Sequence, residues 1–237
     1  MRLPSRFRQS LLRLRRRGCE RLGILRYSRP ALHDLDRKLE RHLDFDHGVF
    51  IEAGANDGVR QSNTYYFEKI RGWTGLLIEP VPELAAECRR NRRAQVAACA
   101  LAARDEPGAT VELHFAGLMS TVRGALGDEA ATAAHVAAGL AAQGLASSRR
   151  LTVPARTLSA LIDEARIGGR IDLLSLDVEG AEITALQGLD LARHAPRFIC
   201  VEARDAAAIT ALLAPRYRLF ETLTDLGTRA DLLYRLH

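Results

Sequence analysis

From Val49 onward the sequence alternates short apolar runs with segments of helical periodicity, and this alternation restricts the fold more than any other feature. Apolar runs of this kind are typical of parallel strands that helices cover on both sides of a sheet. Two runs at the end of the chain follow each other without a helix, which predicts a closing antiparallel hairpin. We therefore predict an α/β fold with a mostly parallel sheet. The expected strands are 49–54, 75–80, 95–102, 110–115, 170–180, 197–205, 217–223 and 231–236, and the expected helices are 62–72, 82–93, 128–143, 157–165, 181–194 and 206–214.

The positive charge of the chain is concentrated in one short segment. The 237 residues carry a net charge of +5, but residues 1–30 contain ten arginines and a single acid, Glu20, a balance of +9. The remaining residues therefore carry −4. A nucleic-acid-binding domain would carry its basic residues on the folded body, so this distribution argues against a nucleic-acid partner.

We divide the chain into a basic N-terminal extension, residues 1–45, and a folded domain, residues 46–237. No apolar run is long enough to span a bilayer, and no secretory signal is evident. A basic amphipathic helix in the extension would lie on an anionic membrane surface or dock on a protein partner, and a solvated arginine-rich tail is the alternative. The apolar residues that recur at helical spacing in the extension are Leu3, Phe7, Leu11 and Leu14.

The four cysteines indicate a reducing environment. They form no CxxC pair, and Cys99 and Cys200 lie in apolar, strand-like runs. We expect reduced core thiols of a cytoplasmic protein, peripheral at the inner membrane surface if the extension binds lipid, rather than disulfides or a zinc site.

The first expected strand ends in the turn EAGANDG, residues 52–58. Ligands of open α/β sheets bind beyond the carboxyl ends of the strands at the switch point, where this turn is expected. Gly54 and Gly58 allow a tight turn and a close approach of the backbone to a ligand. Glu52 disfavours a pyrophosphate and suits a cationic group such as an α-ammonium or a sulfonium. Glu79, at the end of the next strand, suits the two hydroxyls of a ribose, so the two acids together fit S-adenosylmethionine better than a dinucleotide.

Five stretches carry a family resemblance: FIEAGANDGVRQSNTYYFEKIRGWTGLLIEPVPEL, ACALA, LMSTVRGA, IDLLSLDVEGAEITALQGLDL and FICVEA. In these stretches, from about residue 49 to the closing DLLYR, the chain resembles the FkbM family of S-adenosylmethionine-dependent methyltransferases. The resemblance implies a class I, Rossmann-like fold with seven strands, helices on both faces and the last strand inserted antiparallel. It also implies O-methylation of hydroxyls on sugars or natural products. By motif match it places Glu52, Gly54, Asn56 and Gly58 in the cofactor loop and Glu79 at the ribose position. We take as further candidate cofactor-binding residues Asp57, Pro80, Cys99, Ala100 and Asp177.

Three further acids are expected at strand ends near this site: Asp177 and Glu179 in LDVEGAE, and Glu202 in CVEARD. A hydroxyl needs a base, a metal or both to become a nucleophile toward a sulfonium methyl group. We therefore take these three acids as candidate catalytic residues that accept the proton or contact the cofactor. Alternatively, their oxygens hold Mg²⁺, and the sequence leaves the metal undecided. For Glu182, the helix macrodipole is a sufficient explanation.

The loop GLMSTVRGA contains the candidate acceptor-binding residues Ser120, Thr121 and Arg123, with Arg123 suited to an acidic group. An ordinary surface loop is the alternative. Only His114 of the seven histidines is expected near the cleft, and a surface or capping role explains the histidines at least as well. We expect Trp73 to pack in the core rather than to stack on a ligand.

These observations predict an S-adenosylmethionine-dependent O-methyltransferase that acts on a hydroxyl of a sugar, glycoconjugate or small-molecule acceptor. One alternative is a nicotinamide-dependent oxidoreductase, which Glu52 and the missing GxGxxG spacing disfavour. Another is a non-catalytic membrane-docking or assembly module on the same fold, against which Asp177 and Glu179 argue. The acceptor, the methylated position and a homo-oligomeric state stay open at this point.

Overall fold

A computed structural model of the protein describes residues 5–237, and for residues 5–10 and Arg17 it describes the backbone alone. Leu3 and the side chain of Phe7, which belong to the predicted amphipathic pattern, lie outside the described part. The helices are α1 (Ser5–Arg21), α2 (Leu35–Glu40), α3 (Tyr65–Lys69), α4 (Pro82–Asn91), α5 (Glu129–Gln143), α6 (Leu158–Glu164), α7 (Glu182–Gln187) and α8 (Ala206–Leu213), with short 3₁₀ helices η1 (Leu25–Tyr27), η2 (Leu32–Asp34) and η3 (Gly117–Met119). The strands are β1 (Val49–Ala53), β2 (Thr74–Ile78), β3 (Gln95–Ala97), β4 (Ala100–Leu101), β5 (Thr110–Phe115), β6 (Thr121–Val122), β7 (Arg149–Arg156), β8 (Leu173–Leu176), β9 (Phe198–Ala203), β10 (Tyr217–Asp225) and β11 (Ala230–Leu236).

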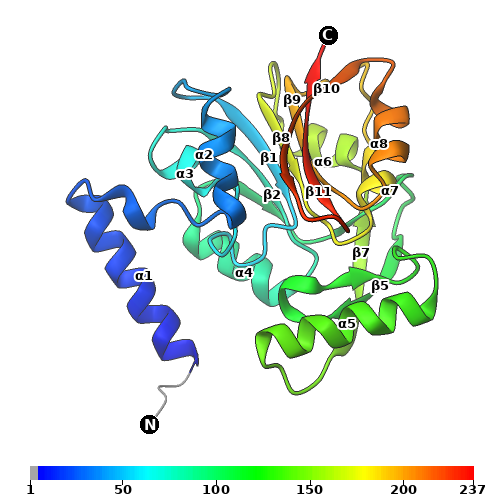
Figure 1. Ribbon diagram of the computed structural model, residues 1–237, viewed down its shortest axis with the longest axis horizontal. Coiled ribbons are helices and arrows are strands. Elements are labelled where there is room, and N and C mark those ends of the chain that lie inside the picture. Colours follow the sequence, from blue (N-terminus) through cyan, green and yellow to red (C-terminus); the bar gives the residue numbers. More distant parts are fainter. Residues whose placement is uncertain (1–4) are drawn as a thin grey trace.

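The main sheet has seven strands in the order β10-β11-β9-β8-β1-β2-β3 (Figure 1). Strand β1 pairs in parallel with β2 and β8, β2 pairs in parallel with β3, and β8 with β9. The C-terminal strand β11 lies between β9 and β10 and runs antiparallel to both. The predicted α/β class and the closing hairpin are confirmed.

Helices cover both faces of the main sheet because successive strand residues face opposite sides. Phe50, Leu77 and Leu173 belong to one buried cluster, which α2, α3 and α4 cover. Their neighbours, such as Ile51 and Leu174, belong to the other cluster, which α6, α7 and α8 cover. The strands therefore read as continuous apolar runs, as the sequence pattern indicated.

A second, four-stranded sheet in the order β4-β7-β5-β6 lies beside the main one. The sequence pattern does not predict this sheet, and the prediction of one strand over 95–102 is wrong. That segment divides into β3, which joins the main sheet, and β4, which pairs with β7. Helix α5 lies along the small sheet in Figure 1, so the segment between β5 and β7 forms a subdomain rather than a surface loop.

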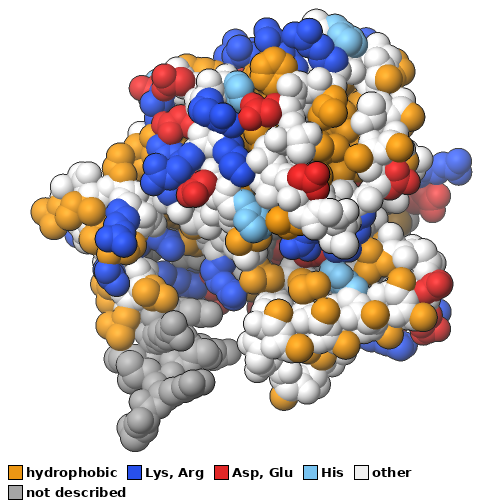
Figure 2. Space-filling model, viewed as in Figure 1, with side chains coloured by type: hydrophobic (Ala, Val, Ile, Leu, Met, Phe, Trp, Pro, Cys, Tyr) orange, Lys and Arg blue, Asp and Glu red, His pale blue; other side chains and the backbone are white. Residues whose placement is uncertain are grey.

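The N-terminal extension consists of two different parts. Leu35, Leu39 and Leu43 are buried at 4 %, 0 % and 0 % exposure in the cluster beneath α2, so the core reaches into the segment that the sequence assigned to the extension. Helix α1 instead lies on the outside, with apolar side chains at the left-hand margin of Figure 2. Among the described residues, no helix combines the length and the apolar character needed to cross a membrane.

The cysteines and Trp73 have the structural roles expected of them. All four cysteines are free thiols, and Cys88, Cys99 and Cys200 are buried. Trp73 is 1 % exposed, and its indole nitrogen donates a hydrogen bond to the carbonyl oxygen of Phe45. Its role is core packing, as predicted.

Candidate active site

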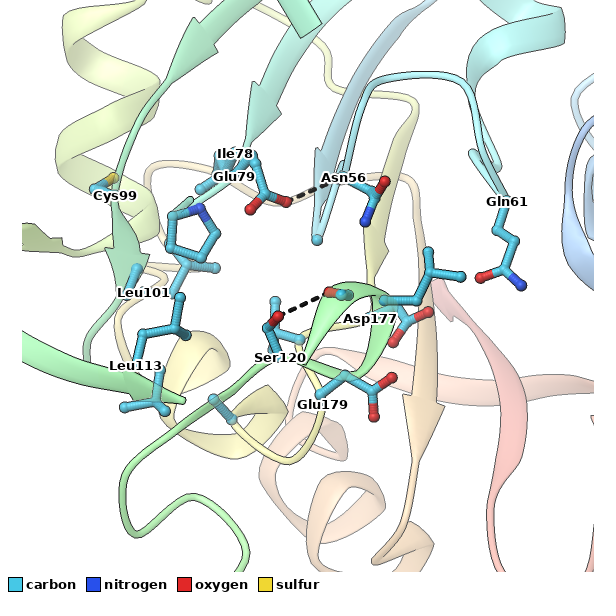
Figure 3. A pocket seen from close by; sticks show the side chains of 18 of the residues that line it. Asn56, Gln61, Ile78, Glu79, Cys99, Leu101, Leu113, Ser120, Asp177 and Glu179 are labelled. Carbon is cyan, nitrogen blue, oxygen red and sulfur yellow. Dashed lines mark hydrogen bonds between the residues drawn. The ribbon is translucent and has the colours of Figure 1, made fainter. Parts of the chain in front are cut away.

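A cleft opens at the carboxyl ends of β1, β2 and β8, where η3 and the small sheet close its other side (Figure 3). The empty space within the cleft, including the part open to solvent, amounts to ≈ 820 Å³. Figure 3 shows polar side chains from several elements around one space, with an apolar wall at one end. Among the lining residues are Gly54, Asn56, Gln61, Ile78, Glu79, Pro80, Cys99, Ala100, Leu101, Leu113, Ser120, Asp177 and Glu179.

The turn after β1 is shaped by the strand beside it. A Cβ atom at Gly54 would overlap the carbonyl oxygen of Asp177, and the φ of Gly54 is +83°. Glycine is therefore required where the backbones of β1 and β8 meet. Asn56 also has a positive φ of 50°, a conformation that asparagine tolerates better than most residues. This fixes the loop that forms the floor of the cleft.

Two backbone hydrogen bonds hold the carboxylate of Glu79 at this floor. One of its oxygens accepts the N–H of Asn56 at 2.8 Å and the other accepts the N–H of Val81 at 2.9 Å. Burial raises the pKa of Glu79 from 4.5 to about 7, although these two hydrogen bonds act against the rise. Each oxygen keeps a further lone pair, so the carboxylate can still accept hydroxyl groups from a ligand.

Glu52 does not line the cleft, and the prediction that it contacts a cationic ligand group is wrong for this structure. Its carboxylate is 4 % exposed and accepts hydrogen bonds from Ser62, Thr64 and the N–H of Asn63. The guanidinium of Arg92 lies 3.5 Å away and is itself fully buried. Glu52 therefore fixes the segment before α3 and lies away from the cleft.

Asp57 and Gly58 also support the loop instead of lining the cleft. One carboxylate oxygen of Asp57 accepts the N–H groups of Val59 and Arg60, as in an Asx turn. A Cβ atom at Gly58 would crowd Cys88 on α4, which explains the glycine without a ligand. Of the predicted cofactor loop, Gly54 and Asn56 remain at the cleft.

The remaining predicted cofactor positions do line the cleft. Pro80, Cys99 and Ala100 lie along it beside an apolar wall, whose members are Ile78, Leu101 and Leu113. Figure 3 shows this wall at the same end of the cleft as Glu79. A flat apolar group can therefore pack next to a group that hydrogen-bonds Glu79.

Asp177, Glu179 and Glu202 converge as the sequence predicted, each with a carboxylate oxygen within 4.8 Å of the others. Asp177 faces the open cleft, while the side chains of Glu179 and Glu202 are 12 % and 11 % exposed. Protein atoms still surround Asp177 on most sides, so desolvation and then the charges of Glu202 and Glu179 raise its pKa well above 3.8. Desolvation, followed by the charge of Glu179, raises the pKa of Glu202 from 4.5 to about 7. A carboxyl group with a pKa of about 7, such as that of Glu202, exchanges protons near neutral pH, which suits a general base.

Two arginines that the sequence analysis did not select partly neutralise this cluster. Arg204 donates to Glu179 at 2.8 Å, and Arg229 lies 3.0 Å from Glu202. Desolvation still outweighs Arg204, and the pKa of Glu179 is raised above 4.5. A basic residue soon after the strand-ending acid, as in the sequence EAR, was the available signal for Arg204.

His135 is another residue near the cluster that the sequence analysis did not select. Its Nε2 lies 3.4 Å from Glu179 Oε2 and has no hydrogen-bond partner among the described residues, although the side chain is only 7 % exposed. Burial lowers the pKa of His135 below 6.5, while a hydrogen bond with the backbone of Met119 opposes this change. The helical stripe Thr132, His135, Val136 and Gly139, which is the buried face of α5, was the signal that indicates an inward-facing histidine.

The three predicted residues of the acceptor loop differ in their positions, and only Ser120 lines the cleft. Ser120 lines the cleft, and its hydroxyl donates to the carbonyl oxygen of Gly117. Thr121 is fully buried and donates to the carbonyl oxygen of Glu179, so it positions the carboxylate loop. Arg123 and His114 are not among the cleft residues, and His114 lies 3.2 Å from Glu112 instead.

Structural comparisons return methyltransferases at low similarity. The chain is similar to the methyltransferase FkbM from Methylobacillus flagellatus, with 15 % identity and a TM-score of 0.47 over 80 % of this chain and 44 % of that one, so it spans less than half the length of that protein. It is also similar to a TehB-like SAM-dependent methyltransferase from Corynebacterium glutamicum, with 11 % identity and a TM-score of 0.43 over 94 % and 95 % of the two chains. A third is the 1,6-didemethyltoxoflavin-N1-methyltransferase of Burkholderia thailandensis with bound S-adenosylhomocysteine, with 15 % identity and a TM-score of 0.40 over 100 % and 92 %. Similarities at this level support no functional conclusion.

The family assignment rests on the sequence match. No curated protein matches the chain significantly. The methyltransferase FkbM domain, however, matches residues 52–222, which is 171 of 237 residues and includes the glycine turn and all three acids of the cluster. The chain therefore belongs to the FkbM methyltransferase family.

Proposed function

We propose that the protein is an S-adenosylmethionine-dependent O-methyltransferase whose acceptor is a hydroxyl of a sugar, a glycoconjugate or another small molecule. One observation supports the proposal: Asp177 and Glu179, two carboxyl groups with raised pKa values, line the same cleft as Glu79, and Glu202 lies beside them. Family membership supports methyl transfer and removes the reason to consider a nicotinamide-dependent oxidoreductase.

The residues of the cleft fit this cofactor. Glu79 has free lone pairs for the two ribose hydroxyls, and the wall of Ile78, Leu101 and Leu113 offers an apolar surface for the adenine ring. Asp177 lies on the other side of Gly54, where it can accept a hydrogen bond from the ammonium group. When bound, S-adenosylmethionine supplies an electrophilic methyl group.

The protein's own contribution is to bind the acceptor and remove its proton. A hydroxyl beside Asp177 or Glu202 donates its proton to that carboxylate as the hydroxyl oxygen becomes the nucleophile. Arg204 and Arg229 keep the cluster from accumulating three uncompensated charges, so a deprotonated carboxylate is accessible near neutral pH. We take Ser120, which also lines the cleft, as the residue that orients the acceptor.

The same cluster would also hold a divalent cation. Asp177, Glu179 and Glu202 each direct one oxygen toward a common point, and the unpartnered His135 Nε2 faces Glu179. Two hydrogen-bond acceptors facing each other at 3.4 Å repel unless a proton or a cation lies between them. Oxygen ligands with one imidazole suit Mg²⁺ or Mn²⁺. Calorimetric titration of Mn²⁺ into the wild type and Asp177→Asn tests this directly, and equal heats for both proteins would exclude the site.

The function is tested by incubating the enzyme with methyl-labelled S-adenosylmethionine and pools of sugars, glycans and small hydroxyl compounds. We expect mass spectrometry to show a gain of one methyl group on a defined species. Asp177→Asn or Glu202→Gln should lower the rate by about 10²–10⁴-fold if its carboxyl is the base. Asp190→Asn, which removes an exposed acid bound to Arg193, is the matched control. Undiminished turnover in both cluster variants would remove the assigned base, and methylation of an amine or a carbon would remove the O-methyl assignment.

A further inference from the structure

Helix α1 and the turn after it present polar side chains to the domain and apolar side chains to solvent, the reverse of most surface helices. In the described part of α1, the side chains that face the domain are polar and spaced three and four residues apart: Arg13, Arg16 and Glu20. Arg13 pairs with Glu87 on α4, and Glu20 accepts hydrogen bonds from the hydroxyls of Ser28 and Tyr65. Residues at this spacing share one face of a helix, so the contacts define the inner side of α1.

The outer side of this segment is apolar. Six of the ten large hydrophobic residues that are exposed in the described chain lie between positions 11 and 25. Leu14 is 67 % exposed and Leu22 is 77 % exposed, so neither is packed against the domain. Figure 2 shows apolar side chains along this side of the molecule. The six are Leu11, Leu12, Leu14, Leu22, Ile24 and Leu25.

Positive charge surrounds these leucines. Residues 1–30 carry a balance of +9, and the exposed Arg21 and Arg26 form no ion pair with any described side chain. A cavity between α1 and the domain is lined mainly by basic side chains, among them Arg16, Arg90 and Arg93. An apolar strip within a basic field matches an anionic lipid surface, whose interior accepts leucines and whose headgroups attract arginines.

We propose that α1 and the following turn, residues 11–26, are a docking surface for an anionic phospholipid bilayer. A second copy of the chain is a poorer occupant, because it would bring two segments of +9 together. Docking also positions the active site. Arg13, on the inner side of α1, lies 3.9 Å from Asp57, which adjoins the cleft residue Asn56, so the thickness of α1, about 10 Å, would separate this part of the domain from the bilayer. Resting on the function proposed above, this placement favours an acceptor hydroxyl carried by a glycan that is linked to a membrane lipid.

Flotation of the full-length protein with lipid vesicles, without cofactor or acceptor, tests the docking surface independently of methyl transfer. We expect binding to vesicles of phosphatidylcholine with about 30 % phosphatidylglycerol, and little binding to phosphatidylcholine alone. The double variant Leu11→Gln/Leu14→Gln should need about tenfold more lipid per substituted leucine for half-maximal binding. Arg21→Gln/Arg26→Gln should weaken binding roughly fivefold per arginine, and added salt should weaken the wild type. The matched control is Leu219→Gln on β10, where the leucine is 45 % exposed, close to the 46 % of Leu11.

Unchanged thermal unfolding of the variants would show that they fold. Equal vesicle binding by the leucine variant and the wild type would overturn the proposal, as would absence of wild-type binding to the anionic vesicles. Sedimentation velocity adds a separate outcome: a dimer of the wild type that the leucine variant loses would assign the surface to a second copy instead. The proposed function would survive either result, since methylation of a soluble acceptor does not require the bilayer.

Discussion

Replacing Glu79 by glutamine should change how the stability of the protein depends on pH. The pKa of Glu79 is about 7 in the folded protein, against an ordinary value of 4.5. The folded state therefore binds this proton more tightly, and the group's stabilising contribution is present below about pH 4.5 and lost as pH rises through about 7. A pKa difference of about 2.5 corresponds to about 3 kcal/mol at about 1.4 kcal/mol per pH unit. The side chain is only 5 % exposed, so solvent screening does little to reduce this value.

Urea unfolding at about pH 4.5 and about pH 8 measures the effect. Between these conditions, the free energy of unfolding of the wild type should fall by about 3 kcal/mol more than that of Glu79→Gln. Glutamine also replaces one of the oxygens that accept the N–H groups of Asn56 and Val81, but that loss is the same at both pH values. The acids of the Asp177 cluster titrate alike in both proteins and cancel in the difference. Parallel pH dependences in the two proteins would refute the account of Glu79 as a carboxylate held in a desolvated site.

Three other substitutions or conditions give separate tests. Gly54→Ala should destabilise the protein by about 2–4 kcal/mol, because alanine at φ +83° is strained and its Cβ overlaps the Asp177 carbonyl. Thermal unfolding measures this loss, and a loss below about 1 kcal/mol would contradict the close approach of the two backbones. Arg92→Leu should cost about 3–5 kcal/mol by leaving Glu68 buried without its 3.0 Å partner, whereas Arg89→Leu, which removes an exposed arginine, should have little effect in the same urea titration. The value of kcat/KM should rise about tenfold per pH unit up to about pH 7 and then level off if Glu202 is the base, and a rate independent of pH between about 5 and 8 would count against it.

The strand-ending acids show what the sequence pattern can predict. Glu79 and Asp177 follow buried strands directly, and the carboxyl ends of parallel strands meet at one edge, so their convergence on a single cleft follows from the topology. Sequence could not predict the direction of Glu52. It lies inside β1, where side-chain direction alternates, and its partner Arg92 comes 40 residues later, at the C-terminal end of α4.

The small sheet and the basic residues near Glu179 were harder to predict, because both depend on contacts between segments that are distant in the sequence. Strand β7 contains Pro154, a residue that usually argues against a strand, and the strand becomes plausible only through its pairing with β5. His135 and Arg204 reach Glu179 from α5 and from the end of β9, far apart in the chain. Contacts of this kind depend on tertiary placement, which local spacing does not encode.

The central claim is that the cleft binds S-adenosylmethionine with Glu79 at the ribose. Isothermal titration of S-adenosylhomocysteine into the wild type, Glu79→Ala and the control Glu83→Ala, which removes an exposed acid on α4, tests it most directly. We expect a Kd on the order of micromolar for the wild type and the control, and a value roughly 10–150-fold higher for Glu79→Ala, the loss associated with hydrogen bonds to a charged group. The same affinity in all three folded proteins, or no binding to the wild type, would contradict the account.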